Sequence, residues 1–355
     1  MFLANREADH GHALEPVDAE CLGGSAPAMV LDALSRYVDV SPTPLLLMPR
    51  LAGELGIGAL AVKNESSRLG LGSFKALGGA YAVIRLARER AVKGERLTVA
   101  CATAGNHGRS VAFGARLVGA RAVVFVHERV SEARVEGLRE LDADVVRVPG
   151  VYDDAVGEAA RRAAESGWAI VSDTAWPEYE QVPRMVMQGY TVLMQETLAG
   201  MTQPPTHVFV QAGVGGLAAS VTGHLREVLG SSGPTVVVVE PERAACLLAS
   251  ARAGWAVTVA RAEATVMTML ECYKPSLTAW RILMRSAEAF MTVSDEEAMS
   301  ALRRLAQPVG GDPSVSTTPS GAAGLAGLLR AAGNPAIRAA LALDAKARVL
   351  TVVTE

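Results

Sequence analysis

Short runs of β-branched and other apolar residues alternate with alanine-rich stretches through most of this chain. Strands of a parallel sheet that is covered on both faces read as continuous apolar runs, and the helices between them carry an apolar stripe. The alternation therefore predicts an α/β fold with mostly parallel sheets covered by helices. The predicted strands are Leu45–Met48, Ala59–Asn64, Thr98–Thr103, Ala122–His127, Asp144–Pro149, Ala169–Asp173, His207–Gln211, Thr235–Glu240 and Arg348–Thr354.

The alanine-rich stretches between these strands predict the helices. Ser294 and Glu297 have the spacing of a capping box, which marks the start of the last of these helices. A stretch rich in glycine, serine and threonine follows it at residues 310–321. The predicted helices are Lys75–Ala91, Arg109–Leu117, Ser131–Leu141, Asp153–Ser166, Met185–Ala199, Leu217–Leu229 and Ser294–Ala306.

The length of 355 residues predicts two domains, because single hydrophobic cores rarely grow much beyond about 250 residues. Strand and helix units are short and regular from Thr98 to Asp173, and longer before and after. We therefore predict a small inserted α/β domain at residues 80–176. Residues 1–79 and 177–355 then form one large, discontinuous domain.

Charge and composition exclude several classes of partner. The net charge of −3 leaves no basic field for nucleic acid or anionic lipid. No apolar stretch reaches the roughly 18 residues of a membrane span, and residues 1–10 lack the apolar centre of a secretory signal. We expect a cytoplasmic protein with a small-molecule substrate.

The distribution of cysteine and histidine predicts no metal site. The four cysteines are scattered without metal-ligand spacing, which favours buried reduced thiols. His10 and His12 form an isolated pair with no third ligand nearby, and we expect them to lie in a flexible N-terminal tail.

The first of three candidate motifs is Ser73-Phe74-Lys75, which follows a glycine-rich loop. Ser73 is placed to cap the helix that starts at Lys75. The positive end of the helix dipole opposes a protonated amine there, which lowers the pKa of Lys75 and favours the neutral nucleophile. An exposed lysine at the start of a helix is the structural alternative.

The second motif is the AGNHG turn at residues 104–108, at the carboxyl end of a predicted parallel strand. Open α/β sheets bind ligands at that edge, and glycines let the backbone approach closely. Asn106 can donate a hydrogen bond to an oxyanion. For His107 we favour a structural hydrogen bond over a role as a base.

The third motif is the glycine loop formed by Gly213, Val214, Gly215, Gly216 and Leu217. Backbone amides at the start of a helix form a phosphate site. The loop also fits a loose dinucleotide-binding pattern in which Glu240 supplies the acidic residue, so an NAD-dependent dehydrogenase is an alternative. That alternative gives no role to Lys75 or to the AGNHG turn.

One cofactor gives a role to all three motifs. An aldehyde needs a lysine amine, a phosphate needs the glycine loop, and a phenolic oxygen needs a neutral donor such as Asn106. These are the reactive and binding groups of pyridoxal 5′-phosphate. We therefore predict this cofactor.

The chain resembles the fold-type II pyridoxal-phosphate enzymes, the tryptophan synthase β and threonine dehydratase superfamily. Within it, the sequence is most similar to the diaminopropionate ammonia-lyases, with matching stretches from residue 41 to residue 355. The clearest matches are FKALGGAYA (74–82), AGNHGRSVA (104–112), DTAW (173–176), QAGVGGLA (211–218) and SGAAGL (320–325).

The resemblance implies a role for individual residues. Lys75 forms the Schiff base with the cofactor, Asn106 contacts its hydroxyl, and the loop Gly213–Leu217 binds its phosphate. Thr354 takes the place of the hydroxyl that this superfamily sets beside the pyridine nitrogen. The resemblance also implies a homodimer with the cofactor in the cleft between the two predicted domains.

The implied reaction is an α,β-elimination from an L-amino acid. Lys75 removes the α-proton, and 2,3-diaminopropionate yields pyruvate and ammonia. A β-amino group leaves only when protonated, and Asp173 is the candidate carboxylate that keeps it so. A strand-end aspartate that caps a turn is the structural alternative for Asp173.

Departures from the family pattern keep other functions open. Ala104 stands where diaminopropionate ammonia-lyases carry the aspartate expected to act on D-substrates, which predicts L-selectivity. The stretch 271–276 and Pro319 also depart from the family, and the chain ends at Glu355 before the family's tail. An L-serine or L-threonine dehydratase is therefore the nearest alternative, and a binding or regulatory protein that lost catalysis is another.

Overall fold

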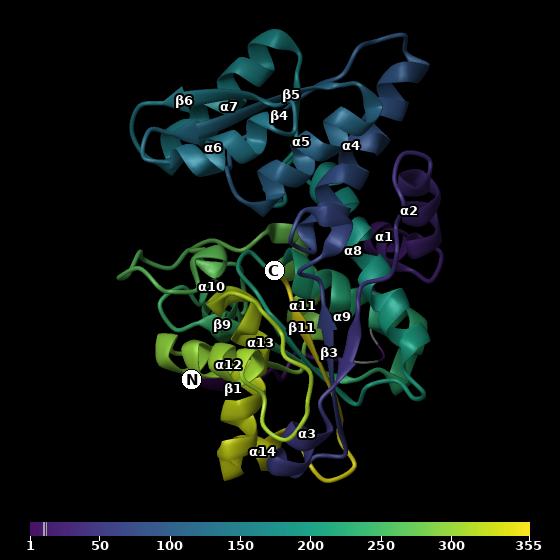
Figure 1. Ribbon diagram of the computed structural model, residues 1–355, viewed down its shortest axis with the longest axis vertical. Helices are drawn as coiled ribbons and strands as arrows, with labels where there is room; N and C mark the ends of the chain where they lie inside the picture. Colours follow the sequence, from purple (N-terminus) through teal and green to yellow (C-terminus); the bar gives the residue numbers. More distant parts are fainter. Residues whose placement is uncertain (10, 12) are drawn as a thin grey trace. The chain divides into compact units, whose positions relative to one another are not determined.

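The structure is a computed structural model that describes residues 1–9, 11 and 13–355 (Figure 1). It divides into two compact units. The first unit comprises Met1–Gly24, Pro42–Ser67 and Leu193–Glu355, and the second comprises Ser25–Ser41 and Arg68–Val192. The sequence places the borders at residues 80 and 176 instead. The second unit is larger because helix α4 (Lys75–Val92) packs along helix α5 (Asn106–Val118) and belongs with it.

The first unit contains a seven-stranded sheet in the order β1-β10-β9-β8-β11-β3-β2. The five inner strands run parallel, and β1 and β2 pair antiparallel at the two edges. This confirms the mostly parallel sheet. The strands are β1 (Phe2–Ala4), β2 (Leu45–Leu47), β3 (Ala59–Asn64), β8 (His207–Gln211), β9 (Thr235–Pro241), β10 (Ala289–Val293) and β11 (Arg348–Val353).

Helices cover both faces of this sheet (Figure 1). On one face, α13 contacts β8, β9, β10 and β11, and its alanines share a core with Phe209 and Met291. On the other, Trp280 of α11 lies against Phe290, whose ring centroid is 6.3 Å away. The helices are α1 (Pro16–Leu22), α3 (Pro49–Leu55), α9 (Gly216–Leu229), α10 (Cys246–Ala253), α11 (Leu277–Ser286), α12 (Asp295–Ala306), α13 (Pro319–Gly333) and α14 (Pro335–Ala340).

The N-terminal residues correct one expectation. Phe2–Ala4 form strand β1, paired with β10, so the start of the chain is not a flexible tail. The reason is that β10 would otherwise present an unpaired edge, and Phe2 packs against the core there. His10 and His12, which the expectation of a tail also concerned, lie outside the described residues. The predicted capping box is confirmed, since Ser294 and Glu297 bond each other's backbone N–H groups.

The second unit contains a four-stranded parallel sheet in the order β6-β5-β4-β7. Alanines of α7 pack on Val123 and Phe125 to form the core of one face. The elements are α2 (Ala26–Ser35), α4, β4 (Thr98–Cys101), α5, β5 (Arg121–His127), α6 (Glu132–Arg139), β6 (Asp144–Val148), α7 (Tyr152–Ser166) and β7 (Ala169–Ile170). Helix α8 (Gln181–Gly200) begins in this unit and ends in the first.

Glycines bring the helices of the second unit into close contact. A Cβ on Gly114 of α5 would lie 2.7 Å from the Cα of Ala80 on α4. A Cβ on Gly189 of α8 would lie 2.6 Å from the Cα of Gly78, also on α4. Such distances leave no room for a side chain. The glycines of α4, α5 and α8 therefore hold α4 between two neighbours, and α4 begins at Lys75.

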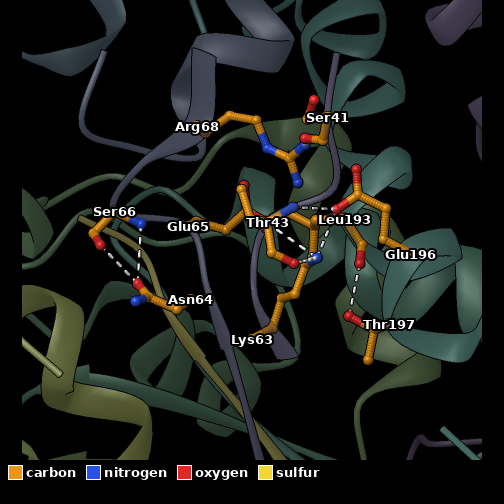
Figure 2. Close-up of polar contacts among 10 residues, drawn as sticks. All are labelled: Ser41, Thr43, Lys63, Asn64, Glu65, Ser66, Arg68, Leu193, Glu196 and Thr197. Carbon is orange, nitrogen blue, oxygen red and sulfur yellow. Dashed lines mark hydrogen bonds and ion pairs between the residues drawn. The ribbon is translucent and has the colours of Figure 1, made fainter. Parts of the chain in front are cut away.

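A buried charged cluster connects β3 to α8 within the first unit (Figure 2). The Lys63 ammonium donates to a Glu196 carboxylate oxygen at 2.6 Å and to the Thr43 carbonyl at 2.8 Å. The Thr43 hydroxyl donates to Glu65 at 2.6 Å. Lys63 and Glu65 are almost wholly buried, so each charge depends on these partners.

Candidate active site

Lys75 is the first residue of α4. Its backbone N–H donates to the Ser73 hydroxyl at 3.1 Å, but Phe74, and not Ser73 as predicted, occupies the N-cap position. The Lys75 side chain is 25% exposed. The start of the helix thus presents a partly accessible amine.

The Lys75 Nζ atom lies 2.5 Å from Oδ2 of Asp173. Burial raises the pKa of Asp173, but the charge of Lys75 and its hydrogen bond outweigh burial and hold that pKa well below its ordinary value. Asp173 is therefore ionised at neutral pH and pairs with an ammonium group. The structure brings together the two residues that the sequence proposes for catalysis.

Side chains hold the three residues that precede Asp173. The Tyr179 hydroxyl donates to the Ile170 carbonyl at 2.7 Å and accepts the Ser172 N–H at 3.1 Å. The Tyr179 ring stacks on Trp176 at 4.0 Å. The predicted strand 169–173 therefore ends early, at Ile170. Tyr179 is a site residue that the sequence analysis misses, because nothing in the DTAW stretch predicts this return contact.

His107 bonds the same segment, from α5. Its Nε2 lies 2.9 Å from the Val171 carbonyl, and burial lowers the pKa of His107 from 6.5. This bond confirms the structural role favoured from the sequence. Three contacts therefore position the segment that carries Asp173. Two come from His107 and Tyr179, and the third is the bond from the Val171 N–H to the Ala100 carbonyl of β4.

The AGNHG turn forms the start of α5 rather than a loop before it. The helix begins at Asn106, three residues earlier than predicted, with Gly105 at the N-cap. A Cβ on Gly108 would lie 1.9 Å from the Thr103 carbonyl oxygen, so only glycine fits there. Asn106 is half-buried at the helix start, where an amide side chain and the helix dipole both favour an anionic oxygen.

The glycine loop of the first unit lies between β8 and α9. Gly215 adopts a φ of +100° at the N-cap, which favours glycine. The first turn of α9 is closed by the bond from the Ala219 N–H to the Gly215 carbonyl at 2.8 Å. The backbone N–H groups of Gly216, Leu217 and Ala218 come before this first helical bond, so no carbonyl of the helix accepts from them. This donor set at the end of a 14-residue helix fits a phosphate.

Thr354 follows β11 in the first unit and is 5% exposed. Its hydroxyl oxygen accepts from the Nε2 of Gln211, the last residue of β8, at 3.2 Å. A buried neutral hydroxyl at this position fits a pyridine nitrogen. Gln211 is a second residue that the sequence analysis does not include among the site residues.

Glu240, the acid of the dinucleotide alternative, has another role. It is fully buried, and its two oxygens accept the Leu247 and Leu248 backbone N–H groups at 2.7 Å each. These bonds cap the start of α10. The carboxylate is therefore not available to a ribose hydroxyl.

Among residues 1–9, 11 and 13–355, no group of three or more histidine, cysteine or acidic side chains is placed to hold a metal ion. No helix of the described ranges is long and apolar enough to cross a membrane. The cysteines are free thiols, and Cys21, Cys101 and Cys246 are buried as predicted, while Cys272 is half-buried.

Comparison with protein families gives one match over most of the chain. The profile described as "Pyridoxal-phosphate dependent enzyme" matches residues 38–355. Diaminopropionate ammonia-lyase of Escherichia coli K12 is 36% identical over 340 residues, which cover 90% of this chain and 85% of that protein. The enzyme of Salmonella typhimurium with the same name is 35% identical, over 94% of this chain and 90% of its own length.

Solved structures give the same result. The Escherichia coli diaminopropionate ammonia-lyase in complex with an aminoacrylate-PLP azomethine reaction intermediate matches with a TM-score of 0.89 and 33% identity. The match covers 100% of this chain and 93% of that one. A threonine deaminase from Solanum lycopersicum, at 19% identity and a TM-score of 0.78, shares the fold over 100% of this chain and 87% of its own.

Proposed function

The chain belongs to the family of pyridoxal-phosphate-dependent enzymes, and from that premise we propose that it is an ammonia-lyase that converts L-2,3-diaminopropionate to pyruvate and ammonia. The observation that carries this proposal is the contact between the Lys75 amine and the ionised Asp173 carboxylate. It places the lysine that would bind the cofactor beside a carboxylate that pairs with ammonium groups.

We assign a role in cofactor binding to each residue that the family resemblance names. Lys75 binds its aldehyde carbon, Asn106 contacts its hydroxyl, and Thr354 lies at its ring nitrogen. The backbone of the glycine loop, Gly213, Val214, Gly215, Gly216 and Leu217, binds the phosphate. When bound, pyridoxal phosphate withdraws the electron pair of the substrate's Cα–H bond.

The chain's own residues then move protons. Released by the substrate amine, Lys75 takes the α-proton, which a neutral amine accepts and an ammonium group does not. Asp173 pairs with the Lys75 ammonium in this structure, and it pairs with the β-ammonium group of the substrate in the same way. That pairing keeps the leaving nitrogen protonated, so that it departs as ammonia.

The same contact argues against a hydroxyl leaving group. The hydroxyl group of serine or threonine leaves as water only when an acid donates a proton to it, and an ionised Asp173 carboxylate has no proton to give. We therefore rank an L-serine or L-threonine dehydratase second. Pyruvate release from L-2,3-diaminopropionate and from L-serine, compared at equal concentration, tests this order, and faster release from serine would reverse it.

We infer selectivity for the L-substrate, because Ala104 brings no carboxylate to the turn before α5. Lys75 then remains the base for the α-proton and reaches one face of the substrate. Turnover of D- and L-2,3-diaminopropionate is the test, and comparable rates would contradict the inference.

We further propose that the protein is a cytoplasmic homodimer. The family resemblance supports the dimer. Light scattering of the purified protein gives its mass in solution, and a monomer at micromolar concentration would reject the dimer.

A further inference from the structure

Four oxygens surround the side-chain amide nitrogen of Gln211. Its Nε2 lies 2.9 Å from the Val352 carbonyl, 3.1 Å from the Gly321 carbonyl and 3.3 Å from the Ser320 carbonyl. The fourth oxygen is the Thr354 hydroxyl, at 3.2 Å. Gln211 is 1% exposed, so these contacts replace water.

The surrounding oxygens determine which way the amide points. Carbonyl oxygens accept hydrogen bonds and cannot donate them, so a flipped amide would set the Gln211 oxygen against three acceptors. The nitrogen therefore faces them. Since an amide nitrogen does not accept hydrogen bonds, the Thr354 oxygen is the acceptor in its contact with Gln211.

The Thr354 proton must then point elsewhere. Within the described residues, the Thr354 hydroxyl donates to no acceptor, although the residue is only 5% exposed. A buried donor without an acceptor is unfavourable unless a ligand supplies one. The Thr354 oxygen already accepts from Gln211, so the bond that a ligand must supply is an acceptor for the hydroxyl proton.

We propose that Gln211 is a positioning residue that holds the Thr354 hydroxyl as a hydrogen-bond donor to the cofactor's ring nitrogen. The proposal rests on the proposed function, which sets Thr354 beside that nitrogen. A ring nitrogen that accepts this bond carries no proton of its own. Gln211 would therefore set the protonation state of the cofactor without touching it.

The rest of the Gln211 side chain supports a role in the site. Its Oε1 is buried and has no hydrogen-bond partner among the described residues. A Cβ on Gly324 of α13 would lie 2.8 Å from that oxygen, so the glycine allows the helix to pack directly on the amide. A buried amide oxygen without a hydrogen-bond partner does not stabilise the fold, so stability alone does not explain a glutamine at this position. The contacts of its nitrogen with Thr354 and the three carbonyls do explain it.

The test compares two cofactors in the complete protein. Pyridoxal phosphate and its analogue with C–H in place of the ring nitrogen are each titrated into the apoprotein, and the two dissociation constants are compared. We expect the wild-type protein to prefer pyridoxal phosphate by about fivefold, the effect of one neutral hydrogen bond. Gln211→Met and Thr354→Val should each abolish the preference, and the double variant should behave as either single variant.

Thr351→Val is the matched control. Thr351 lies on β11, three residues before Thr354, and is 1% exposed. Its buried hydroxyl has no partner in the described part of the chain, so its loss should leave the preference unchanged. Thermal unfolding reports whether each variant folds. If Gln211→Met does not fold, Gln211→Asn replaces it, because its shorter amide cannot reach Thr354.

The outcomes separate this proposal from the proposed function. A full preference retained in folded Gln211→Met and Gln211→Asn, or no preference in the wild-type protein, would overturn the role of Gln211 while leaving the lyase intact. Failure of the wild-type protein to bind either cofactor would instead overturn the proposed function.

Discussion

The Lys75 Nζ atom and the Asp173 Oδ2 atom lie 2.5 Å apart, although 98 residues separate them in the sequence. The contact joins the start of α4 to the segment that follows β7. Each side chain is about a quarter exposed. The pair is therefore accessible to a substrate and close enough for each group to set the charge of the other.

Asp173→Asn tests this pair directly. The amide cannot hold an ammonium group by charge, so we expect kcat for L-2,3-diaminopropionate to fall by about 100-fold, the usual effect of losing one proton-transfer partner. Asp144→Asn breaks an exposed ion pair with Arg121 in the same unit and should leave kcat unchanged. Equal activity of the two variants would remove Asp173 from the mechanism.

Tyr179→Phe tests how Asp173 is held. The variant loses the hydroxyl that bridges Ile170 and Ser172, and we expect kcat to fall by about tenfold, which is about 1.4 kcal/mol in the barrier. KM should change less, because Tyr179 acts on the position of Asp173. Tyr37→Phe, at an exposed tyrosine of the same unit, is the control. A change in thermal stability with an unaltered kcat would reduce Tyr179 to a structural residue.

Most of the strands are predictable from the sequence, for a physical reason. The β3 and β8 strands are largely apolar runs between polar or turn residues, and their predicted and observed ends agree. The β10 strand, AFMTV, has few β-branched residues, and the three-residue β1 exists only because β10 pairs with it. Helix α13 contains four glycines, which weaken a helix in isolation, and it is stabilised by burial against the sheet.

The sequence predicts the site residues that belong to a local motif. It does not predict those whose role depends on contacts with residues elsewhere in the chain. Lys75 and the glycine loop each lie at a junction between a loop and a helix, which the sequence marks with glycine and serine. Gln211 and Tyr179 act through bonds to residues that lie far along the chain or to backbone atoms. No local pattern contains that information.

Three buried histidines predict how stability depends on pH. His107, His207 and His224 each bond a backbone carbonyl, and burial lowers the pKa of each from 6.5. Below 6.5 the unfolded chain binds protons that the folded chain does not, so stability is full above that value and is lost as the pH falls. We expect the thermal midpoint to be lower at about pH 5.5 than at about pH 7.5. His207→Gln should reduce the difference, and equal midpoints for the wild-type protein would contradict the prediction.

Lys63→Met tests the buried charged cluster. The substitution leaves Glu196 and Glu65 without their cation in a site where Lys63 is 1% exposed, and we expect the free energy of unfolding to fall by about 3–5 kcal/mol. Arg36→Met breaks an ion pair whose side chains are 60% and 62% exposed, and it should cost less than about 1 kcal/mol. Urea denaturation of both variants measures the difference. Similar losses would show that the cluster contributes no more than a surface pair.

The most direct test of the proposed lyase is a comparison of the wild-type protein with Lys75→Ala. With pyridoxal phosphate, the wild-type protein should show the visible absorbance of the lysine-bound cofactor and release pyruvate and ammonia from L-2,3-diaminopropionate. Lys75→Ala should lose both the absorbance and the turnover while remaining folded. Turnover retained by Lys75→Ala, or a wild-type protein that stays colourless with added cofactor, would contradict the account.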